Sequence, residues 1–147
     1  MKLLIVEDQK YPLEALEFAV DQVVPTHFPD FAKGSYDVAK SYNDAQKRIA
    51  DQEYGIVLLD NRMPYEDQGD LEDRDMSRFS NTLENIGYLL IPTIKDRNPN
   101  TVVIGTSSLS KGELRGMPTP DFTMSKMWGD AETELEAILT QVKGATE

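Results

Sequence analysis

The chain has 147 residues, 39% of them apolar and 28% charged, which is typical of one globular domain. Its 26 acidic residues outnumber its 15 basic ones, and the net charge of −11 makes binding to nucleic acid or to an anionic membrane surface unfavourable. The sequence has no cysteine and a single histidine, His27, which excludes disulfides, thiolate catalysis and metal sites built from cysteine or several histidines. Because no signal peptide or membrane-spanning apolar run is present, we expect a cytoplasmic protein.

The first half of the chain alternates short apolar runs with amphipathic segments. Residues 2–6 form an apolar run like that of a strand buried on both faces of a sheet. An apolar residue then recurs every three or four positions over residues 13–23, which predicts a helix that Pro25 and Pro29 close. Residues 36–39 predict a second short strand, and residues 44–52 predict a second helix.

The second half of the chain continues this alternation. Residues 56–59 and 101–104 are apolar runs that predict buried strands, and residues 122–124 predict a weaker one. Apolar residues at spacings of three and four predict helices over residues 76–90 and 131–142, and Gly87 and Pro92 are places where the first of these can split or kink. Buried strands that alternate with amphipathic helices predict a five-stranded parallel sheet with helices on both faces.

One acidic segment interrupts the pattern. Residues 65–75 contain six acidic residues and one basic residue, which predicts a solvated, mobile loop. The spacing of these acids does not match the ligand pattern of an EF-hand calcium loop.

Ligands of an open parallel sheet bind beyond the carboxyl ends of its strands. Glu7 and Asp8 follow the first predicted strand, Asp60 the third, Thr106 the fourth and Lys126 the fifth. Three crowded carboxylates repel one another and favour a divalent cation, and ligands made only of oxygen select Mg²⁺, with Mn²⁺ or Ca²⁺ as alternatives. A cation on one side and Lys126 on the other would neutralise a phosphoryl group, which Asp60 could accept as an acyl phosphate.

Four segments, in this order along the chain, carry a family resemblance. They are LLIVEDQ at 3–9, IVLLDNRMP at 56–64, VVIGTSS at 102–108 and TMSK at 123–126. Together they resemble the receiver domain of two-component response regulators. The resemblance implies a single receiver domain over residues 1–147, without an output domain, and a flavodoxin-like, doubly wound α/β fold. It also implies a five-stranded parallel sheet of order 2-1-3-4-5 with helices on both faces.

The resemblance also implies a role for each residue at the expected edge. These residues are Glu7 and Asp8 as the acidic metal-binding pair, Asp60 as phosphoacceptor and metal ligand, the backbone carbonyl of Arg62 as a further metal ligand, Thr106 as the switch hydroxyl and Lys126 as the family's lysine. The implied cofactor is Mg²⁺, with Mn²⁺ as an alternative. The implied phosphodonor is a histidine kinase or phosphotransfer protein, and the signal would pass to a protein target that the sequence does not identify. Self-phosphorylation from small phosphodonors and self-dephosphorylation are the only enzymatic activities implied, and a homodimer is compatible with the sequence.

The sequence departs from the family's pattern at several places. Gly87 resembles a glycine that usually follows soon after the Met-Pro turn, so we interpret residues 65–86 as an insertion. Met127 stands where the family has a proline, and Thr123 stands where an aromatic residue is frequent. Two glycines and two prolines within residues 109–120 predict a short or irregular fourth helix.

Three other classes of protein share parts of this pattern. In a flavin-binding flavodoxin, Glu7 and Asp8 would repel the phosphate of the cofactor. A phosphohydrolase with an aspartate nucleophile needs a second aspartate two residues later, where Arg62 stands. A pseudo-receiver, which signals by protein binding without phosphorylation, is the remaining alternative; the altered region 109–127 favours it, and the intact acidic residues and lysine argue against it.

Overall fold

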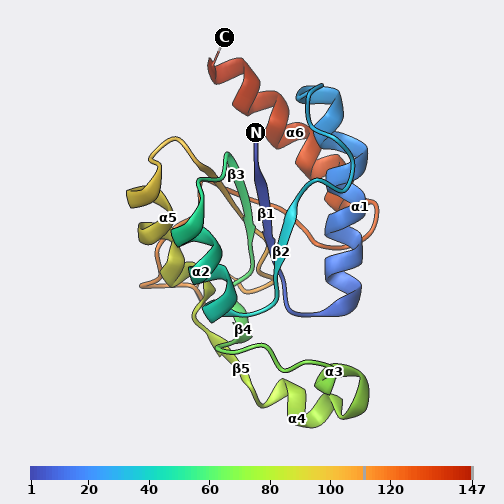
Figure 1. Ribbon diagram of the computed structural model, residues 1–147, viewed down its shortest axis with the longest axis vertical. Helices are drawn as coiled ribbons and strands as arrows, with labels where there is room; N and C mark the ends of the chain where they lie inside the picture. Colours follow the sequence, from blue (N-terminus) through green and yellow to red (C-terminus); the bar gives the residue numbers. More distant parts are fainter. Residues whose placement is uncertain (111, 147) are drawn as a thin grey trace.

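The computed structural model describes residues 1–110 and 112–146. Its centre is a five-stranded parallel sheet with the strand order β2-β1-β3-β6-β7 (Figure 1). The strands are β1 (Leu3–Val6), β2 (Asp37–Ala39), β3 (Ile56–Leu59), β6 (Val102–Gly105) and β7 (Phe122–Thr123). Because β6 and β7 are the fourth and fifth strands of this sheet in chain order, the predicted order 2-1-3-4-5 is confirmed.

Helices cover both faces of the sheet, as predicted. They are α1 (Lys10–His27), α2 (Tyr42–Asp51), the 3₁₀ helix η1 (Gly87–Leu90), α5 (Ile91–Arg97) and α6 (Asp130–Thr146). Helices α1 and α6 lie side by side on one face, and α2 and α5 lie on the other (Figure 1). Successive strand residues point to opposite faces, so Leu3 and Ile5 join the core beneath α1 and α6, while Leu4 and Val6 join the core beneath α2 and α5. None of the helices in the described ranges is both long and apolar enough to cross a membrane.

Helix α1 continues through Pro25 and ends between Pro25 and Pro29, the two prolines that were predicted to close it. The helix ends at His27, and the backbone N–H of Phe28 still donates to the carbonyl oxygen of Val24 at 2.8 Å. A proline removes one backbone hydrogen bond and crowds the preceding turn. The cost is tolerated here because the flanking side chains Val20 and Val24 are buried against the sheet.

The continuous helix predicted over residues 76–90 is wrong, because short separate elements replace it, and the last of them begins at Gly87, where a split was expected. They are α4 (Met76–Ser80), β5 (Leu83–Asn85) and η1. The carbonyl oxygen of Asn61 accepts hydrogen bonds from the backbone N–H groups of Ile86, at 3.0 Å, and Gly87, at 2.8 Å, which ties this stretch to the end of β3. A Cβ on Gly87 would lie 1.9 Å from the carbonyl oxygen of Asp60, so only glycine fits there.

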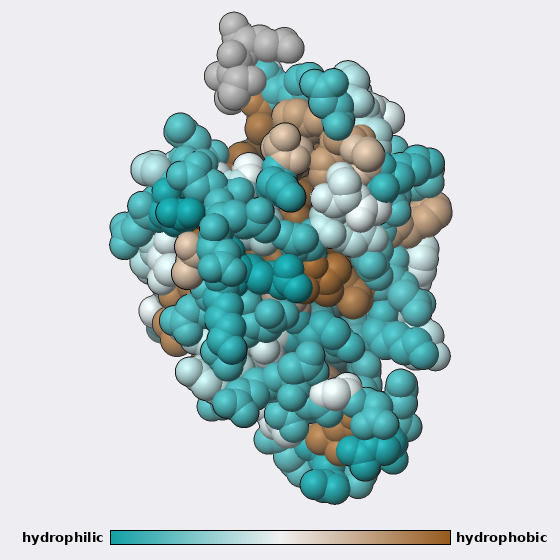
Figure 2. Space-filling view, in the orientation of Figure 1, coloured by the Kyte–Doolittle hydropathy of each residue, from teal (hydrophilic) through white to brown (hydrophobic). Residues whose placement is uncertain are grey.

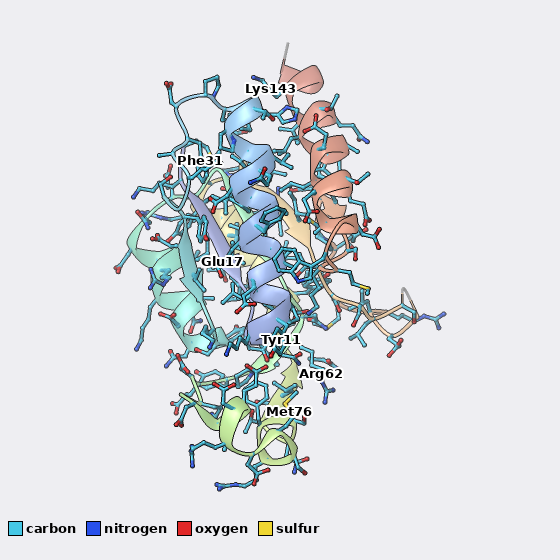
Figure 3. The ribbon with its side chains drawn as sticks, turned by 90° about the vertical axis from the view of Figure 1, so that its right-hand side faces the viewer. Tyr11, Glu17, Phe31, Arg62, Met76 and Lys143 are labelled. Atoms are coloured by element: carbon cyan, nitrogen blue, oxygen red, sulfur yellow. The ribbon has the colours of Figure 1, made fainter. Side chains whose placement is uncertain are left out.

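The protrusion, which we define as residues 62–85, extends from the carboxyl edge of the sheet (Figure 1). It consists of β4 (Arg62–Pro64), α3 (Leu71–Arg74), α4 and β5, with β4 and β5 paired antiparallel. Figure 2 shows that its visible surface is mainly hydrophilic, with a small hydrophobic patch. In Figure 3, Tyr11, Arg62 and Met76 lie at the same end of the molecule, where the protrusion meets the start of α1.

Two polar contacts fasten the protrusion to the rest of the domain. The carboxylate of Glu72 accepts from the backbone N–H of Lys10, the first residue of α1, at 3.0 and 3.3 Å. The carbonyl oxygen of Tyr65 accepts from the backbone N–H of Asn43, near the start of α2, at 2.9 Å. The acidic segment 65–75, predicted as a loop, therefore contains a short helix and carries a cap for α1.

The connection between β6 and β7 is irregular. Its described residues, 106–110 and 112–121, contain turns and no helix, whereas the glycine and proline content predicted a helix that is short or irregular. The described peptide bonds are all trans, including the one that joins Lys126 to Met127.

Candidate functional site

The carboxyl edge of the sheet brings the predicted site residues together. The backbone N–H groups of Glu7, Asp60 and Thr106 each donate to the carbonyl oxygen of the last residue of a neighbouring strand, at 3.0, 3.1 and 2.9 Å. The parallel ladder therefore extends one residue beyond the strands and fixes these residues in register. Asp8 follows Glu7, and Lys126 reaches the same place from the loop after β7.

Three carboxylates form the centre of the site. Glu7, Asp8 and Asp60 are 0%, 2% and 3% exposed, and one carboxylate oxygen from each lies within 4.8 Å of the others. The ammonium of Lys126 donates to Oε1 of Glu7 at 2.8 Å and to Oδ2 of Asp60 at 2.9 Å. Because one ammonium faces three carboxylates, the cluster has an excess of acidic groups.

The second oxygens of Glu7 and Asp60 are held by the backbone. Oε2 of Glu7 accepts from the N–H of Gln9 at 3.0 Å, and Oδ1 of Asp60 accepts from the N–H of Asn61 at 2.8 Å. Both carboxylates are thus oriented on both sides, by a backbone amide and by the lysine. This fixed orientation leaves Asp60 pointing at the centre of the cluster.

Burial and mutual repulsion shift the acidity of these groups. Burial, and then the charge of Glu7, raise the pKa of Asp8 to about 8. The same two effects raise the pKa of Asp60 to about 6, although the charge of Lys126 and the hydrogen bonds to Asp60 oppose them. Burial alone lowers the pKa of Lys126, but the charges of Glu7 and Asp60 outweigh it and raise the pKa above its usual range. Lys126 therefore remains a cation at neutral pH.

The donor set fits a hard divalent cation. Both oxygens of Asp8 are buried and have no hydrogen-bond partner among the described residues, which is costly for a carboxylate unless a cation binds it. Arg62 faces Asn85 across the β4–β5 ladder, and the neighbouring Asn61 carbonyl accepts from Ile86. In an antiparallel ladder, a hydrogen bond between the neighbours Asn61 and Ile86 means that Arg62 and Asn85 exchange no hydrogen bonds with each other. The carbonyl of Arg62 therefore points away from β5.

A hydroxyl group and a cavity adjoin the acidic cluster. The Oγ1 of Thr106 is buried without a hydrogen-bond partner in the described part of the chain. A cavity of about 340 Å³ is lined by Thr106 and Lys126, together with Ser107 and Glu134. The cavity opens on the β6–β7 side of the site, whereas the protrusion is fastened beside the starts of α1 and α2.

Two residues whose side chains pack beside the site, without a described hydrogen bond to the acidic cluster, were not predicted from the sequence. Asn61 is fully buried, and its Oδ1 accepts from the backbone N–H of Tyr88 at 3.0 Å. Tyr88 is 1% exposed, and its hydroxyl accepts from the backbone N–H of Ser107 at 3.4 Å. Asn61 could have been suspected because it follows Asp60 directly, but no local pattern marks Tyr88.

Solved structures with a similar fold include receiver domains of response regulators. A response regulator receiver protein from Sinorhizobium medicae has a TM-score of 0.67 at 15% identity, with 100% of this chain and 97% of that chain covered. A CheY-like receiver domain from Methanospirillum hungatei has a TM-score of 0.62 at 15% identity, with 97% and 94% covered. The signal receiver domain of an HD domain-containing protein from Pseudomonas fluorescens has a TM-score of 0.62 at 17% identity, with 99% and 98% covered.

The chain has the fold of a receiver domain. This likeness covers nearly the whole chain and confirms the predicted flavodoxin-like fold class. No protein-family model matches the sequence, and no curated protein matches it significantly. The receiver fold also explains why the acidic cluster lies at the carboxyl edge, where ligands of doubly wound sheets bind.

Proposed function

We propose that this chain is a phosphoacceptor receiver domain, which takes a phosphoryl group onto Asp60 in the presence of Mg²⁺. The observation that carries the proposal is the buried acidic cluster, in which Lys126 bridges Glu7 and Asp60 while Asp8 has no hydrogen-bond donor in the described structure. A structural acidic cluster would satisfy its oxygens internally. The unpaired Asp8 and the surplus of carboxylates support a site for a cation.

Each residue then has a chemical role. Glu7, Asp8 and Asp60, with the carbonyl of Arg62, would hold Mg²⁺, which would neutralise charge on the phosphoryl oxygens when bound. A carboxylate oxygen of Asp60 would attack phosphorus, forming an O–P bond as the P–N bond of a phosphohistidine breaks. The histidine nitrogen leaves with the electron pair of the broken bond.

The remaining polar groups would stabilise the transferred phosphoryl group. Lys126 can exchange its hydrogen bond with Oδ2 of Asp60 for one with a phosphoryl oxygen, because its ammonium already lies 2.9 Å from that carboxylate. The unpartnered hydroxyl of Thr106 would donate to a second phosphoryl oxygen. The backbone N–H of Asn61 would keep the acceptor carboxylate in place.

The donor would be the phosphohistidine of a histidine kinase or phosphotransfer protein, and the chain would act in the cytoplasm on a protein target. The cavity of about 340 Å³ beside Lys126 and Thr106 also admits a small phosphodonor such as acetyl phosphate. The alternative is a pseudo-receiver that binds partners without phosphorylation. The helix-free connection in residues 106–110 and 112–121 favours this alternative.

Intact-protein mass spectrometry after incubation with acetyl phosphate and Mg²⁺ distinguishes the two functions. We expect wild type and Asp96→Asn, which changes an exposed acid, to gain one phosphoryl group, and Asp60→Asn to gain none. Omission of Mg²⁺ should also prevent the gain. If wild type binds Mg²⁺ but gains no phosphoryl group from acetyl phosphate or from a phosphorylated phosphotransfer protein, the pseudo-receiver is the better description.

A further inference from the structure

Tyr88 connects the two loops that surround the acceptor carboxylate. Its backbone N–H donates to Oδ1 of Asn61 at 3.0 Å, and the N–H of Asn61 in turn donates to Asp60. Its hydroxyl accepts from the backbone N–H of Ser107, the residue after Thr106. Tyr88 thus contacts the residue next to the phosphoacceptor through its backbone, and the residue next to the unpartnered hydroxyl through its side chain.

The fit of Tyr88 depends on a glycine at the end of β6. A Cβ on Gly105 would lie 2.3 Å from the Tyr88 hydroxyl oxygen, 2.8 Å from Cγ of Pro120 and 2.9 Å from Cζ of Tyr88. The phenol, together with Pro120, therefore occupies the space that a side chain at position 105 would fill. Since Gly105 and Ser107 flank Thr106, the ring is packed against the backbone on both sides of Thr106.

This packing makes Tyr88 sensitive to movement of Thr106. The Ser107–Tyr88 hydrogen bond, at 3.4 Å, is long and therefore weak. A phosphoryl group on Asp60 would give the Thr106 hydroxyl a hydrogen-bond acceptor. If Thr106 shifts toward the phosphoryl group, its neighbours Gly105 and Ser107, which both contact the phenol, move with it. A buried tyrosine cannot follow such a shift without changing its own packing.

Free space lies on the other side of Tyr88. The residue lines a cavity of about 430 Å³ together with Thr123 and with residues 114–120 of the β6–β7 connection. Leu114 and Met117 of that connection pack against the same hydrophobic cluster that contains Tyr88. A displaced phenol would therefore change the contacts of this connection.

We propose that Tyr88 is the positioning residue through which a phosphoryl group on Asp60 changes the conformation of the β6–β7 connection. This inference rests on the proposed function, since the phosphoryl group is the trigger. It assigns the readout of phosphorylation to a side chain from η1, and it explains why β6 ends in glycine.

Hydrogen exchange measured by mass spectrometry tests the inference, with and without acetyl phosphate and Mg²⁺. In wild type we expect phosphorylation to change exchange in peptides from the β6–β7 connection by about fivefold or more, the lower range of typical allosteric coupling. Tyr88→Phe, which removes only the hydroxyl, should be phosphorylated to the same extent but lose most of this change. Tyr36→Phe is the matched control, because it also removes one hydroxyl, which donates to Glu17 at 2.8 Å.

The inference is overturned if phosphorylated Tyr88→Phe responds like wild type, if it is no longer phosphorylated, or if the connection of phosphorylated wild type does not respond. A wild type that gains no phosphoryl group refutes the proposed function instead, and removes the trigger on which the inference depends.

Discussion

Replacing Asp8 by asparagine removes a buried carboxylate that has no hydrogen-bond partner in the described structure while keeping its shape. We expect this variant to be more stable than wild type without metal, and to gain no stability from Mg²⁺. Both effects have one cause. The carboxylate of Asp8 is unfavourable in the folded protein unless a cation binds it.

The size of the effect follows from the pKa of Asp8. This pKa rises from 3.8 to about 8 on folding, so the folded protein binds the proton more tightly than the unfolded chain. When the pKa of a carboxyl is higher in the folded protein than in the unfolded chain, the group lowers the free energy of unfolding. This loss of stability grows as pH rises from the pKa of the unfolded chain to that of the folded protein. At about 1.4 kcal/mol per pKa unit, Asp8 should cost wild type about 3 kcal/mol between about pH 5 and about pH 7.

Asp60 adds to the same trend. Its pKa rises from 3.8 to about 6 on folding, so its contribution to the free energy of unfolding also falls as pH rises. This fall covers a lower and narrower pH range than that of Asp8. The Asp8→Asn variant should keep this part of the pH dependence and lose the rest. At about pH 7 in metal-free buffer it should exceed wild type in unfolding free energy by up to about 4 kcal/mol.

Urea unfolding across this pH range, with a chelator and then with Mg²⁺, measures both effects. Mg²⁺ should stabilise wild type, because it binds only the folded site, and should leave Asp8→Asn unchanged. Asp96→Asn, at an exposed position, should behave like wild type. The reasoning is refuted if metal-free wild type keeps constant stability between about pH 5 and about pH 7, or if Asp8→Asn is the less stable protein at the upper pH.

Three further substitutions test separate parts of the structure by urea unfolding. Lys126→Ala leaves Glu7 and Asp60 without their shared ammonium and should lower the free energy of unfolding by about 3 kcal/mol in metal-free buffer. The exposed control Lys33→Ala should lower it little. Equal effects of the two substitutions would refute the stabilising role of the Lys126 ion pairs. Glu72→Ala removes the acceptor for the first N–H of α1 and should cost about 1 kcal/mol, and a cost no greater than that of Glu66→Ala would contradict this cap. Gly87→Ala places a methyl group 1.9 Å from the Asp60 carbonyl oxygen and should lower the free energy of unfolding by about 3 kcal/mol. The helical control Gly144→Ala should be neutral or stabilising. If Gly87→Ala is tolerated, β3 and η1 do not pack as described.

The site could be predicted from the sequence because its residues follow strands that lie in register. Val6 pairs with Leu59, and Leu59 pairs with Gly105, so the next residue in each case reaches the same edge. Short apolar runs identify such strands well, and the chemistry of the residues that follow then identifies the site. Lys126 was found in the same way, although β7 is only two residues long.

The sequence indicated an insertion over residues 65–86, but the internal structure of the protrusion could not be predicted, because its apolar spacing also fits a helix. Leu83 lies in a strand that pairs with Pro64, and the next residues are tied to the Asn61 carbonyl. These pairings join residues about twenty positions apart in the sequence, and local periodicity contains no information about them. The same holds for Tyr88 and Gly105, whose complementary sizes are visible only once β6 and η1 are packed together.

The most direct test of the central claim is to locate the phosphoryl group itself. Wild type is incubated with acetyl phosphate and Mg²⁺, reduced with borohydride, which converts an aspartyl phosphate to homoserine, and digested for tandem mass spectrometry. If Asp60 is the phosphoacceptor, homoserine forms at position 60 alone, depends on Mg²⁺ and is absent from Asp60→Asn. Homoserine at another aspartate, or none in a protein that binds Mg²⁺, would contradict the assignment of Asp60 as the phosphoacceptor.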